Sequence, residues 1–165
     1  MKQKIKHYLK EGVIFLLVMS ILANILSLYN AQTLNKQPLT LKEITLLSGE
    51  KFHIDPTKPV LIHFWATWCP TCKLEADNIQ RISNYYQVVT IAVNSGANED
   101  ILKYLKEKDL SFRVVNDQYG IYAKEFQIAG YPTTFIYNAE QKLVFSEVGY
   151  TSSFGLWLRM IWSSL

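Results

Sequence analysis

Two cysteines stand three positions apart in the segment HFWATWCPTCK, residues 63–73, and they are the only cysteines of the chain. Residues three apart on a helix are neighbours on its surface, so Cys69 and Cys72 can reach disulfide geometry if Cys69 lies at a helix start. Pro70 favours that placement, because proline fits the first helical turn, where its missing N–H costs nothing. The pair indicates thiol-disulfide chemistry.

The two thiols have different expected roles. A cysteine at a helix start meets unpaired backbone N–H groups and the positive end of the helix dipole, and both favour the thiolate over the thiol. Cys69 is therefore the expected nucleophile. Cys72 lies one turn further in, where it can attack the mixed disulfide that Cys69 forms and release the partner.

Other uses of the two sulfurs are less favoured. A structural bridge across so few residues closes a very small loop and removes little entropy from the unfolded chain. A structural zinc site needs four ligands, and beyond the N-terminal segment the chain adds only His53 and His63, at unsuitable spacings, so no metal is expected. A copper-binding protein stays open as an alternative, because soft thiolates select Cu(I), although no histidine follows His63.

The net charge is concentrated at the N-terminus. The chain has 165 residues and a formal charge of +3, and the whole excess comes from a basic segment over residues 1–11. The rest of the chain has no net charge and no stripe of Lys and Arg that could follow a phosphate backbone. We therefore expect no nucleic-acid partner. A hydrophobic fraction of 49% suits one globular domain.

An uncharged apolar stretch follows the basic segment. Residues 12–31 contain no Asp, Glu, Lys or Arg, and as a helix they would cover roughly 30 Å, the thickness of the bilayer core. We expect a single-pass anchor in the cytoplasmic membrane, with residues 1–11 in the cytoplasm and a linker, residues 32–38, leading to a periplasmic or other extracytoplasmic domain. The alternative is a cleaved secretory signal, which is less favoured because neither Ala23 nor Ala31 completes a good A-x-A site.

Apolar runs and helical patterns alternate from residue 60 onward. The expected strands are 60–67, 88–93, 112–115, 133–138 and 142–149, and the expected helices are 70–86, 98–108, 117–126 and 152–162. The alternation LTLKEITLL followed by the turn signal SGEK predicts a hairpin before them. This order predicts an α/β fold over residues 39–165, a central mixed sheet flanked by helices.

The segments VLIHFWATWCPTCKLE and GYPTTFIYN, taken together, resemble the thioredoxin superfamily. Within it the chain is similar to membrane-anchored TlpA/ResA/DsbE-like thiol-disulfide oxidoreductases, which include members associated with copper tolerance. The likeness runs from about Leu39 to the C-terminus. It implies a thioredoxin-like fold and a redox-active disulfide, with no other cofactor.

The resemblance also implies roles for residues around the cysteines. Pro132 matches the family's cis-proline, which lies against the disulfide, and the backbone of Tyr131 would pair with an extended substrate segment. The residue after Pro132 is Thr133, at a position where cytochrome-maturation members tend to have glutamate. Pro70 and Thr71, between the cysteines, would tune the redox potential. Trp68 is expected to shield and shape the thiol surface.

Two titratable residues near the cysteines have two interpretations each. Glu75 matches a glutamate of ResA-like members that is placed to influence the thiols, and otherwise it is an exposed acid favoured by the helix dipole. His63 stands six residues before Cys69, where thioredoxins have a buried Asp. It could transfer the proton of Cys72, or it is a satisfied, half-buried strand residue. Asp77 takes the place of a family proline that kinks the helix, so the kink is not expected.

Apolar residues at helical spacing close the chain. They are Phe154, Trp157, Leu158, Ile161 and Trp162. We expect this stripe to cover the sheet, with contact with a membrane surface as the second interpretation, because tryptophan also suits lipid interfaces. Trp65, by contrast, is expected in the core.

These patterns lead to one expected function with alternatives. The chain is expected to exchange disulfides with protein partners as an extracytoplasmic, membrane-tethered reductase or isomerase, recharged by a membrane electron-donor protein. A DsbA-like thiol oxidase is the first alternative, since potentials of Cys-x-x-Cys proteins range from about −270 to −120 mV. The copper-binding protein is the second.

Overall fold

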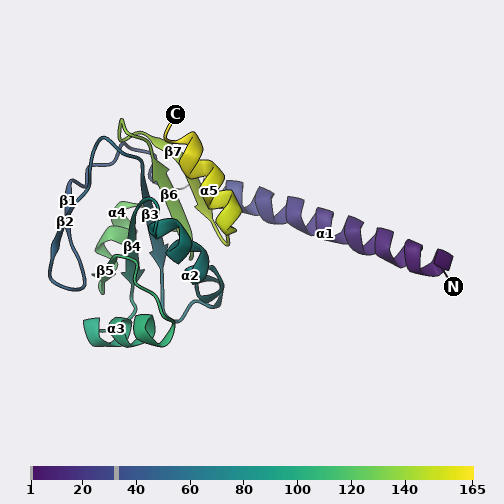
Figure 1. Ribbon diagram of the computed structural model, residues 1–165, viewed down its shortest axis with the longest axis horizontal. Helices are drawn as coiled ribbons and strands as arrows, with labels where there is room; N and C mark the ends of the chain where they lie inside the picture. Colours follow the sequence, from purple (N-terminus) through teal and green to yellow (C-terminus); the bar gives the residue numbers. More distant parts are fainter. Residues whose placement is uncertain (1, 32–33) are drawn as a thin grey trace.

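The computed structural model describes residues 2–31 and 34–165 (Figure 1). Its strands and helices follow the predicted order from residue 60 to the C-terminus. The elements are α1 (Lys2–Ala31), β1 (Glu43–Thr45), β2 (Lys51–His53), β3 (Val60–Trp65), α2 (Pro70–Ser83), β4 (Gln87–Val93), α3 (Asn98–Glu107), β5 (Val114–Asp117), α4 (Ile121–Glu125), β6 (Thr133–Tyr137), β7 (Leu143–Val148) and α5 (Ser153–Trp162).

A five-stranded mixed sheet forms the centre of the domain, in the order β5-β4-β3-β6-β7. β3 pairs in parallel with β4, and β4 with β5, while β6 runs antiparallel to both β3 and β7. β3 is the central strand, and all six of its residues are buried. This is the mixed sheet flanked by helices that the sequence predicts, and β1 and β2 form the predicted antiparallel hairpin beside it.

The two faces of the sheet are covered by different elements. Side chains alternate along a strand, so Leu61 and Trp65 of β3 face one hydrophobic cluster and Ile62 and Phe64 face the other. The first cluster is closed by α2, α3 and α5. The second is closed by α4 and by residues 34–54, which include the hairpin. Trp65 is buried, as predicted, and its indole Nε1 donates to Oγ1 of Thr90 at 3.1 Å.

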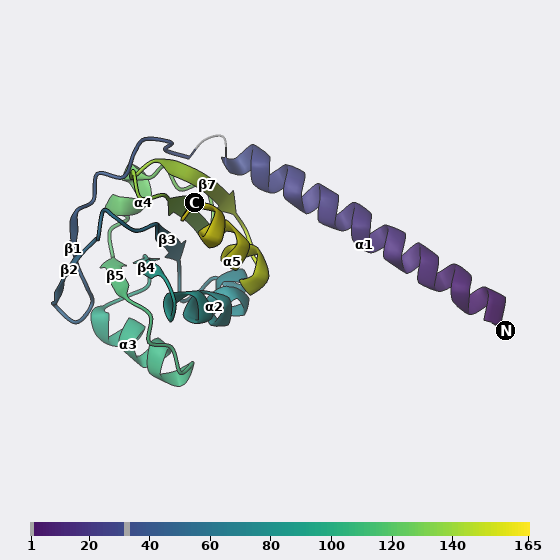
Figure 2. The ribbon, with the colours of Figure 1, turned by 45° about the horizontal axis from the view of Figure 1, so that its top comes forward.

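The N-terminal helix α1 extends away from the domain, and its C-terminal end lies against β7 (Figures 1 and 2). Among the residues that the structure describes, no helix is long and apolar enough to cross a membrane.

The segment between β5 and α4 differs from the prediction. The strand occupies 114–117 rather than 112–115, because its pairing with β4 starts at Val114 opposite Thr90 and ends at Asp117 opposite Val93. The predicted helix 117–126 shortens to Ile121–Glu125. The carboxylate of Asp117 is buried at the strand end and accepts hydrogen bonds from the backbone N–H groups of Ile121 and Ala123, at 2.7 and 2.9 Å.

The prediction for the C-terminal stripe is wrong for most of its residues. α5 places Leu156 and Met160 against the sheet and α2, and both are buried. Phe154, Trp157, Leu158 and Trp162 are exposed instead. The helix carries apolar residues on two sides, and helical spacing alone does not indicate which side faces the core.

Substitution of Met160 by alanine should lower the free energy of unfolding by about 2–5 kcal/mol, because it leaves a cavity under α5. Urea unfolding of the full chain in detergent measures this change. Leu158→Ala is the matched control on the same helix and should cost well under about 1 kcal/mol, because 47% of its surface is exposed. Equal losses in the two variants would contradict this assignment of the faces.

Candidate functional site

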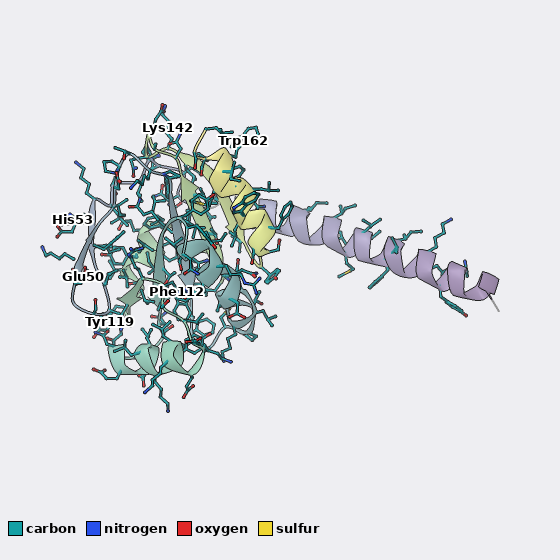
Figure 3. All side chains as sticks on the ribbon, in the orientation of Figure 1. Glu50, His53, Phe112, Tyr119, Lys142 and Trp162 are labelled. Atoms are coloured by element: carbon teal, nitrogen blue, oxygen red, sulfur yellow. A yellow bond between two sulfur atoms is a disulfide. The ribbon has the colours of Figure 1, made fainter. Side chains whose placement is uncertain are left out.

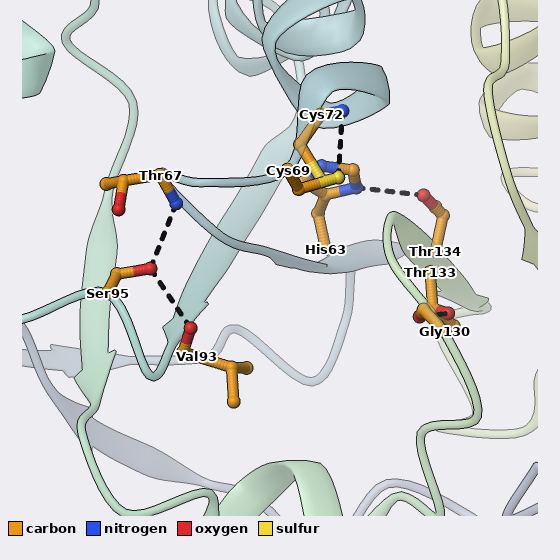
Figure 4. The surroundings of a disulfide bond; sticks show 9 residues. All are labelled: His63, Thr67, Cys69, Cys72, Val93, Ser95, Gly130, Thr133 and Thr134. Atoms are coloured by element: carbon orange, nitrogen blue, oxygen red, sulfur yellow. Dashed lines mark hydrogen bonds between the residues drawn. A yellow bond between two sulfur atoms is a disulfide. The ribbon is translucent and has the colours of Figure 1, made fainter.

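The two cysteines lie where the loop after β3 meets the first turn of α2, and they form a disulfide (Figure 4). Cys69 is the N-cap residue with extended backbone, and Pro70 occupies the first helical turn. The backbone N–H of Cys72 donates to Sγ of Cys69 at 3.2 Å. The sulfur of Cys69 therefore takes the position of a capping oxygen, where backbone N–H groups and the helix dipole stabilise negative charge.

Little of either cysteine is open to solvent. Cys69 is 4% exposed and Cys72 is 2% exposed. Both pack in the cluster formed by β3, α2 and α5, together with Ala76 and Ile79 of α2. A partner can therefore reach only a small part of the disulfide.

Two aromatic residues meet beside the disulfide. Trp68 is 57% exposed, and its indole Nε1 donates to the backbone carbonyl of Asn94 at 3.1 Å. Its ring lies edge-on to the ring of Tyr131, with centroids 5.7 Å apart. These contacts hold Trp68 in a fixed orientation although more than half of it faces solvent.

The segment after Tyr131 leads into β6. The peptide bond between Tyr131 and Pro132 is cis. Pro132 and Thr133 are buried, and the hydroxyl of Thr133 donates to the carbonyl of Gly130 at 2.7 Å. Thr71 is half-buried in the first turn of α2.

His63 is buried in the centre of the sheet, among the residues that surround the disulfide (Figure 4). Strand alternation places it between Leu61 and Trp65, on the face that α2 covers. Its Nδ1 lies 3.0 Å from Oγ1 of Thr134, the residue opposite it on β6. Burial lowers the pKa of His63 to about 3, so its ring is neutral at physiological pH.

Glu75 is fully buried, and the interpretation of it as an exposed acid is wrong. It lies one turn past Cys72 on the buried side of α2, and residues three apart on a helix are neighbours. Its Oε1 accepts a hydrogen bond from the backbone N–H of Thr151 at 3.1 Å. Among the described residues no group donates to Oε2. Burial, and to a smaller extent the charge of Glu147, raises the pKa of Glu75 to about 8.

A polar row crosses the same face of the sheet. Thr134 lies opposite His63 on one side and opposite Glu147 on the other, so the three residues stand on adjacent strands. Glu147 pairs with Arg159 of α5 at 2.9 Å. The sequence indicated only His63 of this row. Thr134 and Glu147 are distant from it in the sequence, and only the pairing of the strands places them beside it.

Asp77 is exposed, and α2 continues through it to Ser83. Among the described residues no group of three or more His, Cys, Asp or Glu side chains could hold a metal ion.

Comparison with known proteins adds to this geometry. Residues 31–146 match the AhpC/TSA family. The thioredoxin-like protein of Haemophilus influenzae is 33% identical over 166 residues, which cover 97% of each chain. Thiol-disulfide oxidoreductase ResA of Bacillus subtilis is 26% identical over 158 residues, 87% of this chain and 86% of that protein.

A solved structure shares the fold. It is a secreted Mycobacterium tuberculosis disulfide oxidoreductase described as homologous to DsbE of E. coli, with a TM-score of 0.62 and 24% identity, covering 72% of this chain and 93% of that one. The chain belongs to the AhpC/TSA family and has a thioredoxin-like fold. It is a homologue of thiol-disulfide oxidoreductases that carries the Cys-x-x-Cys disulfide, and the resemblance to the ResA-like branch is confirmed.

The buried carboxyl of Glu75 should make stability depend on pH. Its pKa rises from 4.5 to about 8 on folding, so the folded state keeps a proton that the unfolded state has lost. Stability is therefore highest below pH 4.5 for this group and falls as the pH rises toward 8. Glu75→Gln should remove this decline, so the variant gains stability relative to the wild type between these pH values.

Urea unfolding of the full chain at a series of pH values measures the difference. Glu99→Gln is the matched control, because it makes the same substitution at an exposed acid in the first turn of α3. A constant difference for Glu75→Gln would mean that the carboxyl is ionised in the folded protein.

Proposed function

We propose that this protein is a membrane-tethered, extracytoplasmic thiol-disulfide oxidoreductase that acts on protein partners as a reductase or isomerase. One observation carries the proposal. Sγ of Cys69 caps the N-terminus of α2 and accepts a hydrogen bond from the backbone N–H of Cys72. The same sulfur forms the disulfide with Cys72. This arrangement supports different chemical roles for the two sulfurs.

The reaction has two exchange steps. In the reduced protein the thiolate of Cys69 attacks one sulfur of a partner disulfide, whose S–S bond breaks, and the leaving thiolate takes up a proton. Cys72 then loses its proton and attacks Sγ of Cys69, which breaks the mixed disulfide and releases the second partner thiolate. The partner gains two electrons, and Cys69 and Cys72 end as the disulfide.

Glu75 is the better candidate for accepting the proton of Cys72. Its pKa of about 8 is close to the ordinary thiol value of about 8.5, so its deprotonated form, the minority form at neutral pH, can accept the thiol proton at little cost in free energy. The pKa of His63 is lowered to about 3, so a proton on its ring would cost more. We assign His63 a positioning role, in which it holds the sheet below the disulfide through Thr134.

The partner segment would approach over Trp68 and Tyr131. In this proposal it lies extended along the backbone of Tyr131, beside Pro132 and Thr133, while Trp68 limits access to Cys69. Pro70 and Thr71 set the redox potential, because they fix the first helical turn, whose backbone N–H groups stabilise the thiolate of Cys69. The exposed aromatic surface and the buried sulfurs support recognition of a protein segment rather than of a small thiol.

The tether rests on the sequence, and the direction of electron flow rests on the tether and on the resemblance to reductive relatives. Residues 12–31 carry no charge and follow four lysines, which supports an anchor with its N-terminus in the cytoplasm. The similar fold of a secreted oxidoreductase supports an extracytoplasmic domain. A tethered reductase needs a source of electrons, and we propose a membrane electron-donor protein.

Replacement of Cys72 by serine should trap partners, because the mixed disulfide on Cys69 is then not resolved. Non-reducing electrophoresis of membranes from cells that express the variant should show adducts that reductant removes. Cys69→Ser is the matched control and should give none. Adducts that form through Cys72 but not Cys69 would reverse the two roles.

The direction of electron flow can be tested with the full chain in detergent. We expect catalysed reduction of insulin by dithiothreitol and equilibration with glutathione at a potential nearer to thioredoxin, about −270 mV, than to DsbA, about −120 mV. A potential near the DsbA value, with negligible insulin reduction, would indicate a thiol oxidase instead.

A further inference from the structure

The outward side of α5 is apolar and exposed. We call Phe154, Trp157, Leu158 and Trp162 the outer face of α5. The exposed fractions are 68% for Phe154 and 67% for Trp162, and about half of the other two side chains is exposed. The four residues recur at helical spacing, so they form one stripe, on the side of the helix away from Leu156 and Met160. Contiguous apolar surface of this kind marks a contact site.

The outer face continues onto the end of α2. A shallow groove of about 300 Å³ runs between the two helices and is lined by Arg81, Ile82, Tyr85, Ser153, Phe154 and Trp157. Tyr85 is also largely exposed. The combination of tryptophan, tyrosine and arginine is typical of surfaces that lie at the boundary between water and lipid.

The position of α5 relative to α1 indicates what covers this surface. α1 ends against β7, the edge strand of the sheet, and α5 lies on the side of the domain from which α1 projects (Figures 1 and 2). Trp162 is labelled on that side in Figure 3. With residues 12–31 as the proposed anchor, the outer face of α5 is among the surfaces nearest to the lipid headgroups.

The composition of α5 suits a lipid surface. Its sequence, SFGLWLRMIW, contains no acidic residue, and its one charged residue is Arg159, so the helix offers no carboxylate for anionic headgroups to repel. A helix with bulky apolar and tryptophan side chains along one side can lie in the interfacial plane with that side in the acyl boundary.

We propose that the outer face of α5 rests on the bilayer and fixes the orientation of the domain on its tether. The inference rests on the proposed anchor. The groove adjoins the C-terminal end of α2, whereas Cys69 lies at its N-terminal end. The 14 residues of α2 span about 20 Å, so docking through this face leaves the cysteines at the end of α2 that is distant from the contact.

Tryptophan quenching by brominated lipid tests the proposal. The full chain is reconstituted in phosphatidylcholine vesicles with or without bromine on the acyl chains. Two of the four tryptophans lie on the outer face, so bromine should remove roughly half of the emission if they enter the acyl boundary. Trp157→Phe/Trp162→Phe keeps the apolar surface and should lose this quenching.

Trp68→Phe is the matched control, because Trp68 is also exposed but adjoins the opposite end of α2; it should keep the quenching. Quenching that disappears in Trp68→Phe instead, or that is absent from the wild type, would overturn the proposal. Flotation of the vesicles after an alkaline wash reports the anchor separately. A chain that floats without quenching keeps the anchor and loses the α5 inference, whereas a chain that does not float contradicts the anchor itself.

Discussion

The site depends on how the start of α2 is capped. Every α-helix leaves backbone N–H groups without partners in its first turn, and an N-cap side chain normally supplies an oxygen to one of them. Here the acceptor is the sulfur of Cys69. The same interaction therefore completes the helix and stabilises the charge that makes this sulfur reactive. The packing of Ile79 and Ile82 under the helix then fixes where that sulfur lies relative to the sheet.

The sheet below the disulfide holds polar groups that an ordinary core would exclude. A buried carboxyl or imidazole is costly unless it is neutral or paired. His63 is neutral and bonded to Thr134, and Glu75 is held by one backbone N–H at one of its oxygens. Glu147 pairs with Arg159 of α5. The strand register that aligns His63, Thr134 and Glu147, together with Glu75 of α2, thus sets the electrostatic environment of the thiols.

The sequence predicted the parts of the molecule that local patterns determine. The buried strands, the helix opened by Pro70 and the pairing of two cysteines follow from periodicity, capping and spacing. Asp117 was misassigned to a helix, because a side chain that caps the next helix across a turn has the same local signature as a residue inside that helix. The burial of Glu75 depends on Thr151 and α5 returning to pack against α2, which no local pattern records.

The C-terminal apolar stripe was wrongly predicted to cover the sheet for a related reason. Periodicity shows that a helix has an apolar side, but α5 has two, and only the final packing chooses between Leu156 with Met160 and Phe154 with Trp157. Thr134 and Glu147 were missed because sheet neighbours are distant in sequence. In each case the missing information was how elements distant in the sequence pack together.

The near-complete burial of both sulfurs has a consequence for how the protein behaves in a pool of small thiols. Exchange rates depend on access as well as on nucleophilicity, and Cys69 and Cys72 present almost no surface. A small thiol such as glutathione therefore meets mostly side chains rather than sulfur. In the proposed function, protein partners that fit the surface beside Cys69 exchange faster than the glutathione pool, which reaches the same equilibrium slowly.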